Sequence, residues 1–100
     1  MERVLTEHIE KTPGILGGKA RIAGHRVRVL DIVAWHERRG LSPDEIVDLF
    51  PSITLADVHA ALAYYFDRRD EIDAEMRKED RVASEMKSRV ASKLQDKLRA

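Results

Sequence analysis

Apolar residues recur at helical spacing in three segments after residue 29, and each segment is bounded by recognisable signals. The first helix is expected from Leu30 to Arg39, where basic residues followed by Gly40 form a stop signal. The second is expected to begin at Ser42, because this serine is followed by a proline and by a glutamate that closes a capping box. The third begins at Thr54. Since neither glycine nor proline follows it, the pattern predicts one long helix without fixing its end.

A β-hairpin is expected before these helices, centred on Gly24-His25. A glycine in the first central position is typical of a two-residue type II′ turn. That turn places Ile22 opposite Val27 and Arg21 opposite Arg28. Because side chains alternate along a strand, the two apolar residues share one face of the hairpin and the arginines share the other.

Beyond Met76 the spacing of the apolar residues changes, because an apolar residue recurs at every fourth position. They are Val82, Met86, Val90, Leu94 and Leu98, with charged residues and serines between them. Such a stripe is too narrow to build a core, so it predicts a helix that needs a partner, or a segment that becomes ordered on binding. The alternative is that the third helix continues and pairs with a second copy as a coiled coil. We therefore expect a domain at residues 1–76 and a charged amphipathic extension at residues 77–100.

The net charge of the chain is zero, but the charges are distributed unevenly along it. The chain has 18 basic and 18 acidic residues, yet residues 1–40 carry a net charge of +3, residues 41–76 carry −7 and residues 77–100 carry +4. Residues 17–29 contain five basic side chains, His25 included, and no acidic one. Such asymmetry is compatible with anion binding at one end of the chain and a protein partner at the other.

The composition also excludes several classes of protein. The sequence has no cysteine, so disulfides and cysteine-based zinc or redox sites are absent. No apolar run approaches the roughly 18 residues of a membrane span, and the first residues lack the apolar core of a signal peptide. We expect a cytoplasmic protein without membrane contact.

Catalytic and metal-binding patterns are not found in the sequence. The four histidines contain no pair spaced for a metal ion, and no Ser-His-Asp arrangement follows from the spacing. The single Gly-Gly-Lys segment is not spaced like a phosphate-binding loop. The sequence therefore predicts no catalytic residue, no metal, no cofactor and no enzymatic activity.

Four segments resemble the small prokaryotic family named domain of unknown function 433. They are PGILGGK at residues 13–19, IAGHRV at residues 22–27, GLSPDEI at residues 40–46 and FPSITLADVHAALAYY at residues 50–65. The resemblance extends from about Ile9 to Asp73. His25 departs from it, since the family usually has Gly-Thr-Arg in this turn.

The resemblance implies a mainly α fold: a three-helix, homeodomain-like or helix-turn-helix-like domain that follows a small β-hairpin and precedes a long C-terminal helix. It also implies a homodimer and a function as the antitoxin of a type II toxin–antitoxin pair. Such an antitoxin occupies a PIN-like ribonuclease toxin with one segment and represses its own operon by binding operator DNA with another.

The hairpin cations are the candidate DNA contacts. Arg21 and Arg28 repel one another across the strands, and a phosphate backbone would relieve that repulsion. The full set is Lys19, Arg21, His25, Arg26 and Arg28. The helix that begins at Thr54 is the competing DNA reader, but it offers Asp57 and no lysine or arginine before Arg68.

The candidate protein contacts lie elsewhere. The stripe at Val82, Met86, Val90, Leu94 and Leu98 is the candidate toxin-binding surface, because an amphipathic helix binds a groove through anchors one turn apart. Trp35 and Tyr65 are the candidate dimer contacts. A stand-alone DNA-binding regulator and a non-catalytic dimerisation module are the alternatives to an antitoxin. A neighbouring gene for a PIN-like protein distinguishes the antitoxin from the regulator, and a promoter gel-shift that stays negative at low salt supports the dimerisation module.

Overall fold

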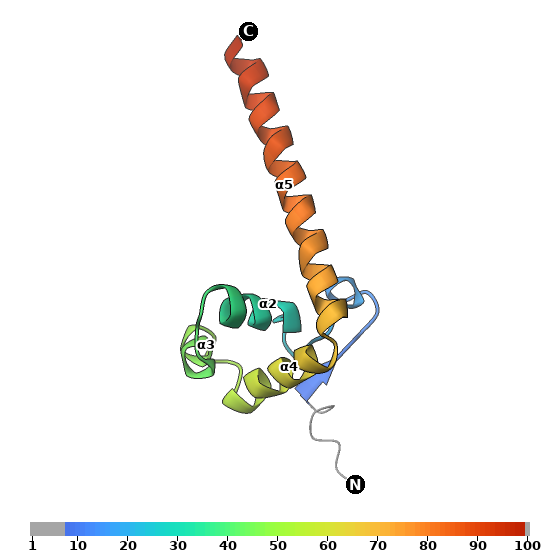
Figure 1. Ribbon diagram of the computed structural model, residues 1–100, viewed down its shortest axis with the longest axis vertical. Coiled ribbons are helices and arrows are strands. Elements are labelled where there is room, and N and C mark those ends of the chain that lie inside the picture. The colour runs from blue at the N-terminus through green and yellow to red at the C-terminus, as the bar shows by residue number, and fades with distance from the viewer. Residues whose placement is uncertain (1–7, 100) are drawn as a thin grey trace. The chain divides into compact units, whose positions relative to one another are not determined.

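The computed structural model describes residues 8–99, and the chain divides into two units between Arg69 and Asp70. The first unit contains, in chain order, β1 (Ile9–Glu10), a 3-10 turn η1 (Leu16–Gly18), β2 (Arg21–Ile22), α2 (Val29–Val33), a π-helical turn η2 (Ala34–Arg38), α3 (Pro43–Leu49) and α4 (Leu55–Asp67). The second contains α5 from Asp70 onward; this helix has 31 residues and runs from Arg69 to Arg99 (Figure 1). The predicted fold class is confirmed, since the chain is mainly helical with a small antiparallel hairpin and a long C-terminal helix. The boundary expected after residue 76 lies inside α5.

Strand β2 lies between two other segments of the chain. On one edge it pairs antiparallel with β1, where Glu10 stands opposite Arg21. On the other edge a single bridge joins Arg21 to Arg28 in the register that the sequence predicts. Arg21 is therefore a central position of this small sheet, whereas the predicted hairpin gives it one neighbour only.

The turn at Gly24 differs from the predicted type II′ turn. The backbone N–H of His25 donates to the Ile22 carbonyl at 3.0 Å, so the central residues are Ala23 and Gly24. Gly24 has a φ of 78°, as the third position of a type II turn requires. The strand register is unaffected, because a hydrogen bond of 2.8 Å from the Ile22 N–H to the Val27 carbonyl closes the loop.

The core of the first unit forms where α4 contacts α2, α3 and both strands. Eight side chains there are at most 1 % exposed: Ile22, Val29, Ile32, Val33, Ile46, Ile53, Val58 and Ala61. These residues come from β2, from α2, α3 and α4 and, for Ile53, from the turn before α4, so the burial of apolar surface holds the short elements together.

Local capping groups define the starts of α3 and α4, as predicted. The Glu45 N–H donates to Ser42 Oγ at 3.2 Å, and the Ser42 N–H donates to Glu45 Oε1 at 3.1 Å. At α4 the Asp57 N–H donates to Thr54 Oγ1 at 3.1 Å, and the Thr54 N–H donates to Asp57 Oδ2 at 2.9 Å. Each capping box satisfies two donors that a helix start leaves without partners.

The uninterrupted helix predicted from Thr54 is wrong, because the helix breaks at Arg68. This residue has φ −132° and ψ 40°, outside the helical region. Its guanidinium carbon lies 4.1 Å from the centroid of the Tyr64 ring, and that of Arg69 lies 5.7 Å from the Tyr65 ring. These cation–π contacts lie at the break, which no glycine or proline marks.

Candidate functional site

Arg21 is buried, although the sequence predicts that it faces solvent and contacts DNA. Its side chain forms an ion pair with Glu10 at 2.5 Å, donates from Nη1 to the His25 carbonyl at 2.8 Å and donates from Nη2 to Thr12 Oγ1 at 3.5 Å. Only 8 % of the residue is exposed. The expectation that its guanidinium is free to contact phosphate is therefore corrected. The carboxylate of Glu10 in β1 pairs with it, on the edge of β2 for which the sequence predicts no neighbouring strand.

Glu10 connects the turn to the sheet. Its Oε1 forms the ion pair with Arg21 and also accepts a hydrogen bond of 3.1 Å from the backbone N–H of Gly24. The same carboxylate thus fixes a side chain in β2 and the backbone of the following turn. Sequence analysis missed this role of Glu10, whose position eleven residues before Arg21 gives no local signal.

Arg28 also has an internal carboxylate partner. Its Nε donates to Asp31 Oδ2 at 3.1 Å and its Nη2 donates to Asp31 Oδ1 at 2.9 Å. The Arg28 N–H donates to the same carboxylate at 3.0 Å, so Asp31 caps the start of α2 as well. A two-pronged pair of this kind holds the guanidinium in a fixed plane and offsets its charge.

The five predicted DNA contacts do not form one cationic face. Arg21 points into the unit and Arg28 pairs with Asp31, whereas Arg26 is exposed at the turn. Lys19 and His25 are half-buried. DNA contact by this turn stays a prediction, and it now depends on Arg26 rather than on the two arginines that face each other across the strands.

The two predicted dimer contacts lie in different environments. Tyr65 is 4 % exposed and belongs to the core of its own chain, which corrects its assignment to an interface. Trp35 is half-buried and stacks on Phe50, with ring centroids 4.3 Å apart and an angle of 16° between the planes. Leu49 beside it is 58 % exposed. A dimer contact at Trp35 stays a prediction.

The start of α4 carries a negative charge, which bears on the competing DNA-binding model. His8 Nδ1 lies 2.7 Å from Asp57 Oδ1. Burial alone raises the pKa of Asp57, but hydrogen bonds from the Thr54 backbone, from His8 and from the Thr54 hydroxyl outweigh it, so the pKa lies below its ordinary value of 3.8. An ionised carboxylate at this end of α4 repels phosphate, so the helix is poorly suited to read DNA.

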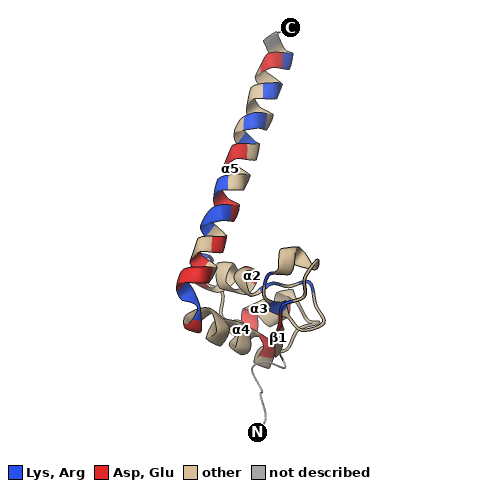
Figure 2. Cartoon of the chain, turned by 90° about the vertical axis from the view of Figure 1, so that its right-hand side faces the viewer, with Lys and Arg blue, Asp and Glu red and all other residues tan. Residues whose placement is uncertain are grey.

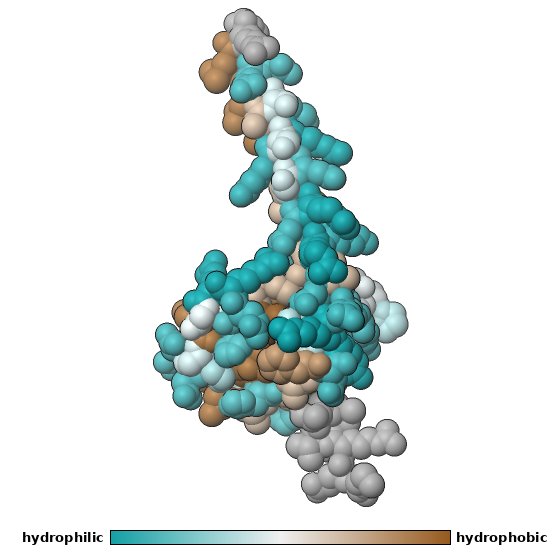
Figure 3. Space-filling view, viewed as in Figure 1, coloured by the Kyte–Doolittle hydropathy of each residue, from teal (hydrophilic) through white to brown (hydrophobic). Residues whose placement is uncertain are grey.

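The stripe on α5 is exposed over its whole length. Its members are Val82 at 48 %, Met86 at 59 %, Val90 at 57 %, Leu94 at 56 % and Leu98 at 85 %. Figure 3 shows hydrophobic residues gathered along one side of the C-terminal part of this helix. Apolar surface of this extent on a helix is typical of a binding surface.

Positive charge accompanies the stripe. Residues 86–98 contain four basic residues and one acidic residue, a net charge of +3. In Figure 2 the basic residues outnumber the acidic ones toward the C-terminal end of α5. The combination of apolar anchors and cations fits a partner surface that is apolar and acidic.

Residues 8–99 contain neither a metal-binding cluster nor a membrane-spanning helix. Histidine and carboxylate side chains there form no group of three or more that could hold a metal ion. No helix in this part of the chain combines the length and the apolar character of a membrane span.

Comparisons with known proteins assign a family. The model of the family described as protein of unknown function (DUF433) matches residues 9–65. A solved structure of a DUF433 member protein from Anabaena variabilis ATCC 29413 is similar, with 36 % sequence identity and a TM-score of 0.65 over 73 % of this chain and 71 % of that one. No curated protein matches the chain. Since the family model covers more than half of the sequence, including both strands and α2 to α4, the chain belongs to the DUF433 family.

Proposed function

We propose that the protein is the antitoxin of a type II toxin–antitoxin pair and binds a PIN-like ribonuclease toxin through the α5 stripe. The observation that carries this proposal is the exposure of five apolar side chains, each at least 48 % exposed, in one row along α5. Scattered apolar residues are normal on a protein surface, whereas a row at one-turn spacing is how an amphipathic helix binds a groove. The family resemblance supplies the class of partner.

The size of the stripe is sufficient for tight binding. Transfer of one valine, leucine or methionine side chain out of water contributes about 1.5–3 kcal/mol. Loss of a single anchor therefore weakens the complex by about tenfold to a hundredfold, since each 1.4 kcal/mol is a factor of ten. An aspartate in place of the anchor adds the cost of burying a charge.

Co-expression with the PIN-like protein encoded by a neighbouring gene tests the proposal. The wild-type chain is expected to relieve growth arrest caused by that protein, and Leu94→Asp is expected to lose this ability. Ser92→Asp is the matched control, because it places the same charge on an exposed residue about 200° around the helix. Growth arrest relieved equally by Leu94→Asp and by the wild type would show that the stripe is not the toxin-binding surface.

Operator binding is the second part of the proposal, and Arg26 is its main residue. Arg26 is exposed at the turn, whereas internal carboxylates hold Arg21 and Arg28. A cation that no internal carboxylate neutralises attracts phosphate more strongly than one held in an ion pair. The expected footprint is therefore small for each copy, and a homodimer doubles it.

The two alternative functions predict different results in the same assays. A stand-alone DNA-binding regulator shifts its promoter DNA but leaves growth arrest unchanged. A dimerisation module does neither, even at low salt, where electrostatic binding is strongest.

A further inference from the structure

The stripe is one row of a four-residue pattern that runs from Arg81 to Leu98 and reads RVAS-EMKS-RVAS-KLQD-KL. Residues four apart advance by about 40° around a helix with 3.6 residues per turn, so the apolar row turns through about 160° between Val82 and Leu98. A straight helix that lies parallel to α5 cannot contact all five anchors. A folded surface that curves around α5 can.

A coiled coil between two copies of α5 fits this pattern poorly. A seam with alternating three- and four-residue steps through Met86 and Val90 also contains Glu79 and Lys93. In a parallel pair of helices, Glu79 would face Glu79 of the second copy and Lys93 would face Lys93, so like charges would repel. The net charge of +3 over residues 86–98 adds repulsion between any two copies that overlap there. Charge therefore favours an acidic partner over a second copy.

A shallow recess lies over Ala91, beside the stripe. Its lining residues are Met86, Lys87, Val90, Ala91 and Leu94. Four of them, Lys87, Val90, Ala91 and Leu94, stand at positions i, i+3, i+4 and i+7, the arrangement that forms a hole for one side chain of a neighbour. Ala91 leaves the recess open, because its methyl group is the smallest of the five side chains.

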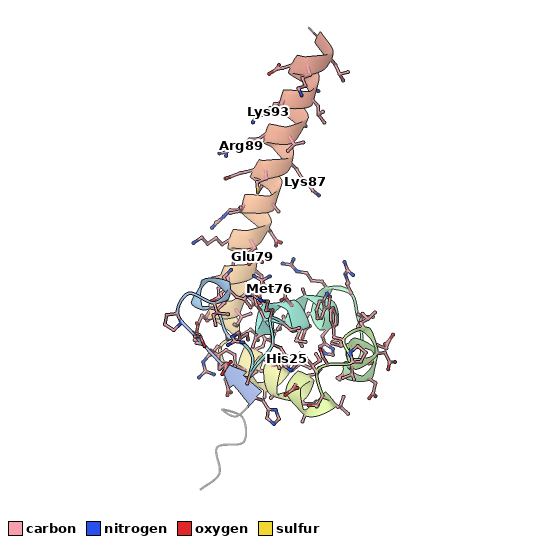
Figure 4. All side chains as sticks on the ribbon, turned by 180° about the vertical axis from the view of Figure 1, so that it is seen from behind. His25, Met76, Glu79, Lys87, Arg89 and Lys93 are labelled. Atoms are coloured by element: carbon pink, nitrogen blue, oxygen red, sulfur yellow. The ribbon has the colours of Figure 1, made fainter. Side chains whose placement is uncertain are left out.

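Lys87 lines this recess, and two further cations lie on other faces of the same part of α5. Figure 4 shows Arg89 and Lys93 projecting from one side of α5 and Lys87 from the other. All three are exposed. A partner that places an apolar side chain in the recess therefore meets the Lys87 ammonium group at its rim, and a carboxylate at that point would pair with it. Lys93 and Arg89 lie about 100° and about 150° around the helix from the recess, so they pair only with a partner surface that curves further around α5.

We propose that the recess over Ala91 receives an apolar side chain from a partner surface whose rim is acidic. This inference rests on the proposed function and specifies the chemistry of the toxin surface: an apolar anchor with a carboxylate beside it. It also assigns Ala91, a residue outside the apolar row, a direct role in recognition.

Filling the recess tests the inference. The probe is the proposed toxin, a PIN-like protein when a neighbouring gene encodes one, titrated against full-length variants by calorimetry. Ala91→Leu is expected to weaken binding at least tenfold, because the added side chain occupies the recess. Ser92→Leu adds the same bulk to the neighbouring exposed residue, about 100° further around the helix, and is expected to bind as the wild type does. Circular dichroism verifies that both variants keep α5 helical.

The possible results separate this inference from the proposed function. Wild-type affinity of Ala91→Leu, together with lost binding of Leu94→Asp, overturns the recess and leaves the proposed function standing. No complex with the wild-type chain overturns both. Self-association of the chain alone that Ala91→Leu abolishes would make a second copy the occupant and would overturn the acidic partner. Lys93→Glu is expected to weaken binding and to reduce its dependence on salt; equal affinity at low salt would likewise count against an acidic rim.

Discussion

Replacement of Arg21 by methionine is expected to destabilise the first unit by about 2 kcal/mol. Methionine keeps the buried hydrocarbon of the side chain but removes the guanidinium. The hydrogen bond of 2.8 Å to the His25 carbonyl has a charged donor, and such bonds contribute about 1.5–3 kcal/mol. The ion pair adds less than about 1 kcal/mol, because the Glu10 side chain is 40 % exposed and water screens it. Recovered apolar contact offsets part of this loss.

The measurement is thermal unfolding followed by fluorescence of Trp35, the only tryptophan of the chain, which lies in the first unit. A loss of about 2 kcal/mol lowers the Tm of a unit of this size by about 8–16 °C. Arg26→Met is the matched control, and it is expected to change stability by less than about 0.5 kcal/mol because Arg26 is exposed. A double-mutant cycle with Glu10→Gln isolates the ion pair. Equal Tm values for the two arginine variants, with operator binding lost only in Arg21→Met, would refute the structural role and restore Arg21 as a DNA contact.

Three further predictions concern the core, acid stability and DNA binding. Ile46→Ala is expected to cost about 2–5 kcal/mol in urea unfolding because Ile46 is fully buried, whereas Leu49→Ala is expected to cost less than about 0.5 kcal/mol. Folding lowers the pKa of Asp57 below its ordinary value of 3.8. The ionised carboxylate therefore contributes its full stabilisation at a pH above that value, and this stabilisation is lost as the pH falls through the pKa of the folded state. Asp57→Asn is therefore expected to lose less stability than the wild type between about pH 5 and about pH 3. Arg26→Glu is expected to weaken operator binding in a gel-shift assay and to reduce the salt dependence by about one counterion.

The helix starts were predictable because their signals are local. The capping boxes at Ser42 and Thr54 need residues only three positions apart, so the sequence contains all of the geometry. The register of Arg21 opposite Arg28 was predictable for a similar reason, since a short loop allows few alternatives.

The environment of the hairpin arginines was not predictable from the stretch that contains them. Residues 17–29 have no acidic side chain, but the two carboxylates that neutralise the arginines, Glu10 and Asp31, lie just outside on either side. Glu10 reaches Arg21 only because β1 pairs with β2, and a two-residue strand gives almost no sequence signal. The break at Arg68 was missed because the sequence has no glycine or proline there to mark it.

The C-terminal part of α5 carries a row of cations beside the apolar stripe, and a single acidic partner can bind both rows. Arg89, Lys93 and Lys97 each precede a residue of the stripe by one position and stand four apart, so each neighbouring pair destabilises the isolated helix by about 0.2–0.5 kcal/mol. The stripe itself exposes apolar surface to water. An apolar partner surface would remove the stripe from water but leave the repulsion between the cations. A phosphate backbone would reduce the repulsion but leave the stripe exposed to water. A groove with carboxylates along one edge relieves both at once, so binding to such a groove is expected to increase the helicity of residues 86–98 more than either apolar or polyanionic ligands do.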